Sequence, residues 1–224
     1  MIVAIDGPAG SGKGTVTKII AKRLGLINID TGAMYRCVAL ASLRKGYTLE
    51  MKKEIADLID EITINFEYTK DDEIQVFLNG EDVTKEIRTT AVNQIVSQIS
   101  SIVDVRLKLV DLQRKMAEGK NVIMEGRDIG TYVFPNADVK IYLDADINER
   151  ARRRLKENLE KGINSTFEEI LDNIKKRDEN DKNKEIGSLK VADGATIVNS
   201  TELTIEGMAD KIEEIILSKK EGER

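Results

Sequence analysis

Five short, largely apolar runs are spaced along the chain, and helical patterns lie between them. The runs cover residues 2–5, 26–29, 121–124, 139–143 and 195–198. Runs of this kind are typical of strands that are buried on both faces of a parallel sheet. The helical pattern after the first run ends at Gly25 and has apolar residues at Val16, Ile19, Ile20 and Leu24. The alternation of strands and helices predicts a doubly wound α/β core with a five-stranded parallel sheet.

One segment alternates between apolar and polar residues instead. Its apolar positions are Ile62, Ile64, Phe66 and Tyr68, followed by Ile74, Val76 and Leu78. Lys70-Asp71-Asp72 supplies a turn between the two halves, and a second turn follows at Asn79-Gly80. Such alternation predicts an antiparallel hairpin with one buried face, which we expect to form a small inserted domain.

Two further segments carry amphipathic helical patterns. Residues 91–118 are predicted to be mostly helical, with Gly119 as the stop. The apolar face of that segment is expected at Ile95, Ile99, Val103, Leu107 and Val110. The C-terminal helix is expected to pack on the core through Ile205, Met208, Ile212, Ile215 and Ile216.

Residues 148–189 form a charged segment with few apolar anchors. A capping-box pattern stands at Ser165-Thr166-Phe167-Glu168, and Lys161-Gly162 separates two helical stretches. We therefore expect two helices that form a charged arm able to move.

The composition of the chain restricts the chemistry that it can perform. Of its 224 residues 41% are hydrophobic, which is enough for a sizeable core. It contains no histidine, which excludes Ser-His-Asp and Cys-His hydrolysis and His-ligated metal sites. The one cysteine, Cys37, cannot form an internal disulfide, and its apolar helical context favours a buried core residue over a reactive thiol. Catalysis would have to use carboxylates, Lys, Arg, hydroxyls, backbone amides or a bound ion.

Charge and hydropathy restrict the partners in the same way. The net charge of -5 at pH 7 argues against a nucleic-acid polymer, which would need a basic face. No apolar stretch reaches the roughly 20 residues of a membrane span, and the first residues lack a signal-peptide pattern. We therefore expect a soluble, cytoplasmic protein with no membrane attachment, and we take a monomer as the working expectation.

A glycine-rich segment lies between the first predicted strand and the first predicted helix. It consists of Gly7, Pro8, Ala9, Gly10, Ser11, Gly12, Lys13, Gly14 and Thr15. The spacing G-x-x-x-x-G-K fits a phosphate-binding loop (P-loop), whose amides wrap a polyphosphate at a helix amino terminus. Lys13 would reach the β and γ phosphates, whereas the hydroxyl usual after the lysine comes one place later, at Thr15. A glycine-rich turn without a ligand is the alternative, but strand, turn, lysine and helix together favour nucleotide binding.

Two more segments follow predicted strands and would face the same edge of the sheet. Asp30-Thr31-Gly32 follows the second strand, and Arg127-Asp128 follows the third. Loops at the carboxyl ends of strands line the ligand crevice in open α/β sheets, so a second substrate is expected there. A guanine-reading N-K-x-D motif is not complete, because Asn183-Lys184 is followed by Glu185-Ile186, and this disfavours a GTPase.

Together these segments resemble the bacterial cytidylate kinases. The resemblance rests on the loop ending G-K-G-T, on D-T-G-A-M-Y-R from residue 30, on G-R-D-I-G-T from residue 126, on E-R-A-R-R-R from residue 149 and on R-D-E-N-D from residue 177. It covers nearly the whole chain and implies transfer of the γ-phosphoryl group of ATP to CMP or dCMP, with Mg²⁺. It also implies a three-layer P-loop core at 1–61, 91–147 and 190–224, an inserted monophosphate-binding domain at 62–90 and a helical lid at 148–189.

The resemblance assigns ATP binding to the P-loop and to the arginines of the lid. Besides residues 7–15, the ATP-binding set comprises Arg150, Arg153 and Arg154. The catalytic set comprises Lys13, Arg127, Asp128 and Arg153. Thr15 is the candidate magnesium ligand, acting together with the ATP phosphates.

For CMP, the resemblance must also satisfy the chemistry of cytosine, which has an amino donor and two ring acceptors. Asp128 would accept from the amino group, Arg106 would donate to the ring acceptors, and the Thr31 hydroxyl would assist. Guanidinium groups match phosphate oxygens well, and the CMP phosphate is assigned to Arg36 and Arg127. The ribose is assigned to Ser97, Arg177 and Asp181. Tyr35 and Lys184 complete the CMP-binding set.

Plainer interpretations of these residues stay open. Thr31-Gly32 could be only a helix cap, and Arg127-Asp128 only a local ion pair. Arg106 could lie on a solvated helix face, and Lys184, which stands where the family commonly has Arg, could be solvated too. An exposed basic face would be made by Arg150, Arg152, Arg153 and Arg154.

Two rival functions also stay open. The first is a kinase for another monophosphate, such as UMP or AMP, although the pairing of Asp128 with Arg106 favours cytosine. The second is a nucleotide-binding module that transfers no phosphate. The complete P-loop and the second-substrate residues argue against such a module.

Overall fold

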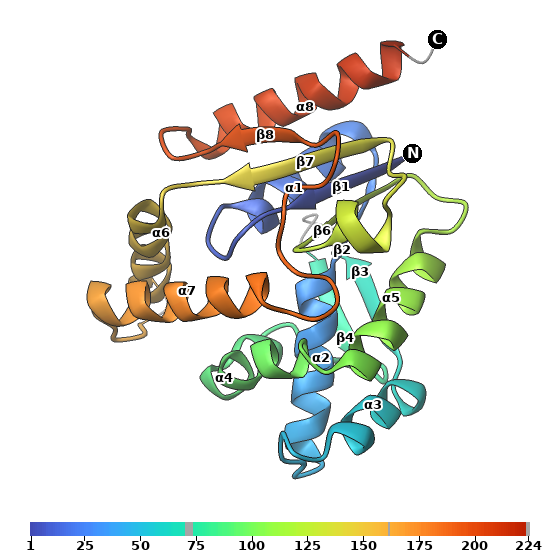
Figure 1. Ribbon diagram of the computed structural model, residues 1–224, viewed down its shortest axis with the longest axis vertical. Helices are drawn as coiled ribbons and strands as arrows, with labels where there is room; N and C mark the ends of the chain where they lie inside the picture. Colours follow the sequence, from blue (N-terminus) through green and yellow to red (C-terminus); the bar gives the residue numbers. More distant parts are fainter. Residues whose placement is uncertain (70–73, 161, 223–224) are drawn as a thin grey trace. The chain divides into compact units, whose positions relative to one another are not determined.

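The computed structural model describes residues 1–69, 74–160 and 162–222. Figure 1 shows the helices and strands of the chain, which divides into two compact units. Unit 1 consists of Met1–Asn28 and Gly119–Arg224, and unit 2 consists of Ile29–Glu118. The domain boundaries that the sequence predicts lie at other positions, and they stay a prediction.

A five-stranded sheet organises unit 1, although one of its strands continues two residues past Asn28, where the chain passes into unit 2. Its strands are β2 (Ile27–Asp30), β6 (Val122–Gly126), β1 (Ile2–Asp6), β7 (Val139–Asp144) and β8 (Thr196–Asn199), in that spatial order. β1 pairs in parallel with both β6 and β7, and β7 pairs in parallel with β8. All five apolar runs of the sequence therefore form strands of one sheet, which confirms the predicted α/β class.

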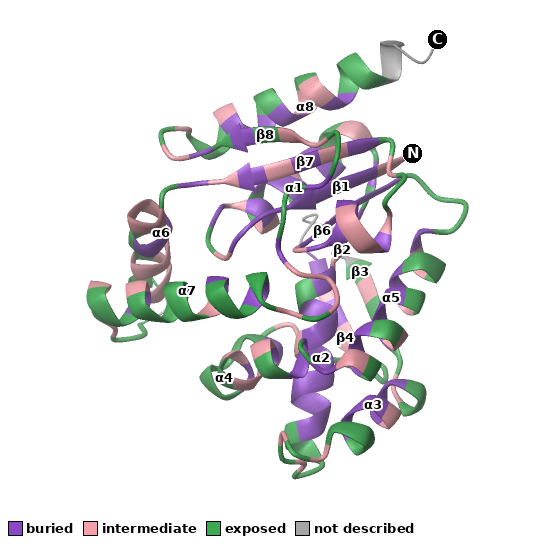
Figure 2. Ribbon diagram, viewed as in Figure 1, coloured by how far each residue is buried: buried purple, intermediate pink, exposed green. Residues whose placement is uncertain are grey.

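The register of the sheet brings the C-terminal ends of its central strands together. Asp6, the last residue of β1, lies beside Gly126 of β6 and Tyr142 of β7. β1 and β6 are buried along nearly their whole length (Figure 2), as continuous apolar runs predict. The segments that follow these strands therefore leave the sheet side by side.

Helices α1 (Lys13–Leu24) and α8 (Ile205–Gly222) pack on this sheet. Val16 and Ile20 of α1 share one apolar cluster with Met208, Ile212 and Ile216 of α8. Gly25 ends α1 in a left-handed conformation, as predicted. None of the helices in the described part of the chain has the length and apolar character needed to cross a bilayer.

The charged segment forms two helices, α6 (Ile147–Glu160) and α7 (Phe167–Lys182). They contact each other through a small cluster that contains Ala151, Ile170 and Ile174. The predicted start of the second helix is wrong by one residue, because Thr166, and not Ser165, is the N-cap and forms the capping box with Glu169. Lys161, part of the predicted separation between the helices, lies outside the described residues.

Unit 2 contains four α-helices among its described residues, together with a small antiparallel sheet. The helices are α2 (Thr31–Arg44), α3 (Lys52–Glu61), α4 (Thr90–Ile99) and α5 (Val103–Ala117). Strands β3 (Ile64–Tyr68) and β4 (Ile74–Leu78) pair with Ile64 opposite Leu78, which confirms the predicted hairpin. A two-residue strand, β5 (Glu81–Asp82), extends it. The predicted turn at residues 70–72 lies outside the described residues.

The single helical face predicted for residues 91–118 is wrong in part. The chain leaves the helix after Ile99 and starts a new one at Val103, so the helical phase is reset. Val92 and Val96 are buried in α4, and Val105 and Leu109 in α5. Leu107, which one continuous helix would bury, is 41% exposed.

Candidate functional site

The P-loop lies between β1 and α1 and passes very close to β7. Gly7 has φ of 153°, and a Cβ atom there would lie 2.1 Å from the carbonyl oxygen of Leu143. Only glycine allows this approach. Within the described chain no side chain caps the start of α1, so its first amides can meet an anion.

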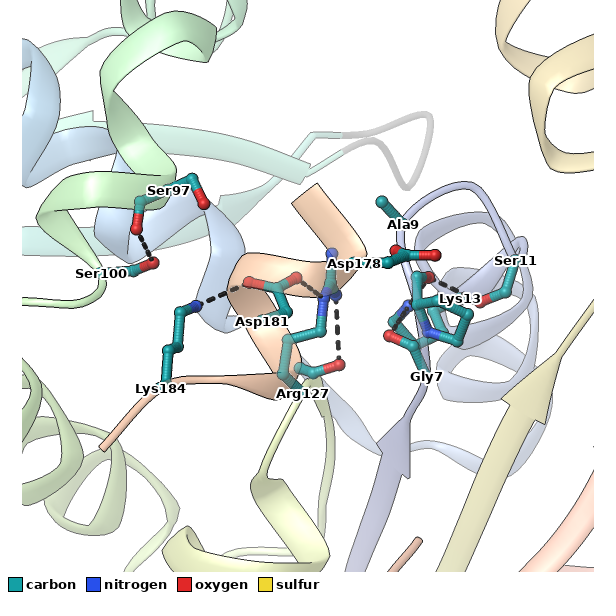
Figure 3. A network of polar contacts seen from close by, with 12 residues as sticks. Gly7, Ala9, Ser11, Lys13, Ser97, Ser100, Arg127, Asp178, Asp181 and Lys184 are labelled. Carbon is teal, nitrogen blue, oxygen red and sulfur yellow. Dashed lines mark hydrogen bonds and ion pairs between the residues drawn. The ribbon is translucent and has the colours of Figure 1, made fainter. Parts of the chain in front are cut away.

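Lys13 is folded back onto this loop (Figure 3). Its Nζ atom donates to the carbonyl oxygens of Gly7 and Pro8 at 2.7 Å and 2.8 Å, and to Ser11 Oγ at 3.2 Å. Burial, together with the positive charge of Arg127, lowers the pKa of Lys13 to about 7. The loop therefore holds a buried amine that an incoming polyphosphate would attract and stabilise as the cation.

Two buried carboxylates stand beside the loop, and sequence reasoning did not assign either of them a role. Asp6 accepts hydrogen bonds from the backbone amides of Ile129 and Gly130 at 2.8 Å and 2.7 Å. Burial raises the pKa of Asp6 to about 6. Glu125 is 8% exposed and accepts from Thr17 Oγ1 at 3.3 Å. The available signal was an acidic residue at the end of each of two buried strands.

The residue after the P-loop lysine has little room for a side chain. A Cβ atom at Gly14 would lie 3.2 Å from Glu125 Oε1, so the carboxylate fills the space where a side chain would begin. Thr15, the candidate magnesium ligand, is exposed on the first turn of α1. Among the described residues no group of three or more acidic, His or Cys side chains could hold a metal. The nearby carboxylate and hydroxyl oxygens nevertheless suit Mg²⁺ that enters with phosphate ligands.

Arg127 and Lys184 hold the two oxygens of the Asp181 carboxylate (Figure 3). Arg127 Nε donates to Oδ2 at 2.8 Å, and Lys184 Nζ donates to Oδ1 at 2.7 Å. Burial raises the pKa of Asp181, but Arg127, Lys184 and Arg177 outweigh it and hold that pKa well below its usual range. The Lys184 side chain is 4% exposed, so the solvated interpretation of this lysine is wrong. Arg127 has a partner 54 residues away, so it is not confined to a local pair with Asp128.

The arginines of α6 do not form a uniform exposed face. Arg150 is 5% exposed and pairs with Asp178 at 2.7 Å. Arg153 donates to the carbonyl oxygen of Ser200 at 2.6 Å and to Glu149 at 3.0 Å. Arg154 pairs with Glu157 near the surface, and the side chain of Arg152 is 66% exposed. The exposed interpretation fits Arg152 best and does not fit Arg150.

Asp128 and Arg177, two further predicted residues of unit 1, lie near these groups. Asp128 is 5% exposed and precedes a short π-helical turn, Ile129–Val133. Its negative charge contributes to the raised pKa of Asp6. The charge of Arg177, which lies on α7, acts on both Lys13 and Asp181.

In unit 2, the predicted base-reading residues are buried. Thr31 is 4% exposed, and its interpretation as a helix cap is wrong because Asp30 is the N-cap of α2. Arg106 is 2% exposed, so the solvated interpretation is wrong for this residue too. Its guanidinium lies 5.5 Å from the centre of the Tyr35 ring, a cation–π distance, and it donates to the carbonyl oxygen of Ser100 at 3.1 Å.

The other residues of unit 2 are placed as follows. Arg36 donates to Asn93 Oδ1. Ser97 accepts from Ser100 Oγ through its carbonyl oxygen, while its own buried hydroxyl has no hydrogen-bond partner among the described residues. Cys37 is fully buried, and burial raises the pKa of its thiol to about 12, which confirms the core interpretation.

Comparison with known proteins identifies the family. The family model described as cytidylate kinase matches residues 3–218. The chain belongs to the cytidylate kinase family. Members of this family are phosphotransferases, so the chain is a kinase, and the resemblance seen in the sequence is confirmed.

Individual relatives support the same assignment over nearly the full length. The cytidylate kinase of Caldicellulosiruptor bescii is 44% identical over 213 residues, which cover 95% of this chain and 94% of that protein. The cytidylate kinase of Caldanaerobacter subterraneus subsp. tengcongensis is 46% identical over 221 residues, covering 99% and 96%. A crystal structure of an uncharacterized protein from Eubacterium ventriosum shares the fold, with a TM-score of 0.51 at 14% identity, and the match covers 97% of this chain and 99% of that one.

Proposed function

We propose that this chain transfers the γ-phosphoryl group of ATP to CMP or dCMP and releases ADP with CDP or dCDP. The observation that carries the proposal is the buried Lys13, folded into a complete P-loop, in a chain of the cytidylate kinase family. Single-cysteine composition fits a reducing cytoplasm, where both substrates would be available.

ATP binding is assigned to the P-loop and to α6. The amides of residues 7–15 would surround the phosphates, and Lys13 would leave the loop carbonyls for the β and γ oxygens. Arg153 would contribute positive charge from α6, next to the P-loop residue Ser11, and Arg150 and Arg154 belong to the same basic segment.

CMP binding is assigned to residues of each unit. In unit 1, Asp128 would accept from the cytosine amino group, and Arg127 would bind the phosphate. The ribose would meet Arg177 and Asp181, with Lys184 supporting that carboxylate.

Unit 2 contributes the rest of the proposed CMP contacts. Arg106 and Thr31 would contact the cytosine ring, Tyr35 would support Arg106, and Arg36 would contact the phosphate. The Ser97 hydroxyl, which has no hydrogen-bond partner in the part of the chain that the structure describes, is available for a ribose hydroxyl.

Phosphoryl transfer suits a chain without histidine, because positioning and charge stabilisation supply most of the catalysis. Holding two reactants in line can lower the barrier by roughly 7–11 kcal/mol. Mg²⁺, when bound, would neutralise charge on the β and γ phosphates, and Thr15 and Glu125 are the proposed protein oxygens for the ion or its waters. Lys13, Arg127 and Arg153 would stabilise the transferring group. Asp128 would orient CMP and not act as an essential base, because the CMP phosphate is already an anion.

A coupled ADP-release assay tests the proposal. The purified chain is supplied with ATP, Mg²⁺ and either CMP, dCMP, UMP or AMP. We expect turnover with CMP or dCMP well above that with UMP and AMP. Preference for UMP or AMP would indicate a kinase for that nucleotide, and ATP binding without any turnover would indicate a silent module.

Asp128→Ala tests the assignment of cytosine recognition. Losing a charged hydrogen-bond acceptor typically costs about 1.5–3 kcal/mol, so kcat/KM for CMP should fall roughly 10- to 150-fold. The affinity for ATP should stay within about twofold, because Asp128 is not assigned to ATP. Equal CMP kinetics in variant and wild type would show that the cytosine assignment is wrong.

A further inference from the structure

The buried face of helix α7 is apolar in its first half and acidic in its second half. Its first half is anchored by Ile170 and Ile174, whereas its second half buries the carboxylates Asp178 and Asp181. Burying an isolated carboxylate is costly, so each of these two requires a cationic partner. Arg127 and Lys184 neutralise Asp181, and Arg150 neutralises Asp178.

Arg150 connects three parts of unit 1 through one buried guanidinium. Its Nη1 atom donates to Asp178 Oδ2 of α7 at 2.7 Å and to the carbonyl oxygen of Ala9 in the P-loop at 3.1 Å. Its Nε atom donates to the carbonyl oxygen of Ala145, directly after β7, at 3.1 Å. Arg150 therefore joins the phosphate-binding loop to the helix that carries Asp181.

The P-loop also packs directly against Arg150. A Cβ atom at Gly10 would lie 3.2 Å from Arg150 Cβ and 3.3 Å from the Arg150 carbonyl oxygen. A side chain at Gly10 would force its neighbours to shift by a few tenths of an ångström, and the φ of +79° at this residue also favours glycine. The contact is independent of the hydrogen bond to Ala9 and places the loop at the same residue of the helix.

Polyphosphate binding would disturb this connection at its loop end. Lys13 now donates to the carbonyl oxygens of Gly7 and Pro8, immediately before Ala9. An anion in the loop would draw Lys13 and the loop amides toward itself and rearrange the carbonyl groups beside it. The carbonyl that Arg150 holds belongs to this rearranging segment.

The other end of the connection offers a second hydrogen-bond acceptor. Asp178 Oδ1 is buried and has no hydrogen-bond partner among the described residues, while Oδ2 accepts from Arg150. A guanidinium can bind both oxygens of a carboxylate at once. The pair can therefore change from a contact with one oxygen to a contact with two when the loop moves, which gives two discrete states.

We propose that Arg150 is a positioning residue that acts through Asp178, so that a polyphosphate in the P-loop sets the position of Asp181 on α7 and tightens the binding of CMP. The proposal rests on the proposed function, because it takes CMP as the ligand of Asp181. Arg150 then contributes to ATP use through the loop backbone, besides any contact with ATP itself.

Calorimetric titration of CMP tests this coupling directly. CMP is titrated into the protein alone and in the presence of Mg²⁺ with an ATP analogue whose β,γ-bridging oxygen is replaced by a methylene group. In the wild type the analogue should tighten CMP binding by about fivefold or more, the usual lower range for coupled sites. In Asp178→Asn and in Arg150→Lys the analogue should change the affinity for CMP by less than about twofold. The double variant should lose no more of this coupling than either single variant, because the two residues belong to one ion pair.

Matched controls separate coupling from a general loss of structure. Asp172→Asn changes an exposed carboxylate on α7, and Arg152→Lys changes an exposed arginine on α6; both should keep the wild-type factor. Near-ultraviolet circular dichroism checks the fold, and if the Asp178 variant does not fold, Arg150→Lys decides the question alone. An uncoupled wild type, unchanged coupling in the variants, or equal loss in the controls would overturn the inference. Turnover of the wild type is measured separately, and its absence would overturn the proposed function instead.

Discussion

Asp6 and Asp181 are both buried in unit 1, yet the pKa values of their carboxyl groups move in opposite directions. Asp6 accepts hydrogen bonds from two backbone amides but has no ion-pair partner among the described residues. The effect of burial therefore outweighs that of the hydrogen bonds and raises the pKa of Asp6 to about 6. Asp181 has cationic partners at both oxygens, and their charge outweighs burial. The neighbours of a buried carboxylate, more than burial itself, decide which protonation state the fold favours.

The raised pKa of Asp6 predicts how stability depends on pH. The folded value of about 6 lies above the ordinary value of 3.8, so between them the folded chain binds more protons than the unfolded chain. Ionisation of Asp6 then opposes folding, and its contribution to stability falls as the pH rises through this window. From about pH 4 to pH 7, the free energy of unfolding of the wild type should fall relative to Asp6→Asn by up to about 3 kcal/mol, at 1.36 kcal/mol per pKa unit.

Urea unfolding of both proteins across this pH range measures the difference. Asp172→Asn on the surface of α7 serves as the control and should show no comparable trend. A wild-type stability that stays parallel to that of Asp6→Asn would contradict the prediction.

Lys184 allows a second test at the residue scale. Lys184→Met keeps the aliphatic stem but leaves Asp181 Oδ1 without its lysine partner. Since a charged hydrogen bond contributes about 1.5–3 kcal/mol, KM for CMP should rise roughly 10-fold or more, while KM for ATP changes by less than about twofold. Steady-state kinetics measure both, with Lys182→Met, an exposed neighbour, as the control. Equal changes in the two KM values would assign Lys184 a general structural role.

At the scale of elements, the hydrophobic pattern of the sequence predicted the strands of the sheet but not the break between α4 and α5. Each strand of the parallel sheet lies on a short, largely apolar run, so all five were visible in the sequence. The break between α4 and α5 was not visible, because apolar residues continue at helical spacing across residues 100–102. Leu107 would share a face with Ile99 only if one helix contained both.

The same distinction applies to the candidate site, where local motifs were predictable and contacts between distant residues were not. The P-loop was predictable because its spacing is local. The ion pairs of Arg127 with Asp181 and of Arg150 with Asp178 join residues 54 and 28 positions apart. No periodicity connects such residues, so their partners emerge only from the folded chain.

The N-cap of α7 gives a prediction at this scale. Thr166 Oγ1 accepts from the Glu169 amide at 3.2 Å, and the Glu169 carboxylate accepts from the Thr166 amide at 2.9 Å. Thr166→Ala should destabilise the protein by about 0.5–2 kcal/mol and speed hydrogen exchange in the first turn of α7. Thr166→Ser keeps the hydroxyl and should restore protection. Exchange that is equally fast in both variants would show that this cap contributes little.

For the whole molecule, net charge conceals how its charges are distributed. The chain is acidic overall, with 40 Asp and Glu against 35 Lys and Arg. In unit 1, however, Lys13, Arg127 and Arg177 are close enough to influence one another or a shared carboxylate. The acidic total disfavours polymeric anions, while this concentration of positive charge suits a small one.

Ligand-induced stabilisation of the whole molecule would distinguish the two proposed substrates without any turnover. A ligand that binds only the folded state at 100 times its Kd adds about 2.7 kcal/mol to stability, which raises Tm by roughly 5–10 °C in a chain of this size. We expect such an increase from the non-transferable ATP analogue with Mg²⁺, and a separate one from CMP.

Two variants should remove these increases selectively. Lys13→Met removes the amine that the P-loop holds, so it should abolish the increase caused by the analogue and keep that caused by CMP. Asp128→Ala should abolish the increase caused by CMP and keep that caused by the analogue, because the Asp128 carboxylate is assigned to cytosine alone. Thermal unfolding monitored by circular dichroism measures all four combinations of variant and ligand. If either variant lost both increases while keeping its own Tm, the two assignments could not be independent, and one residue would serve both ligands.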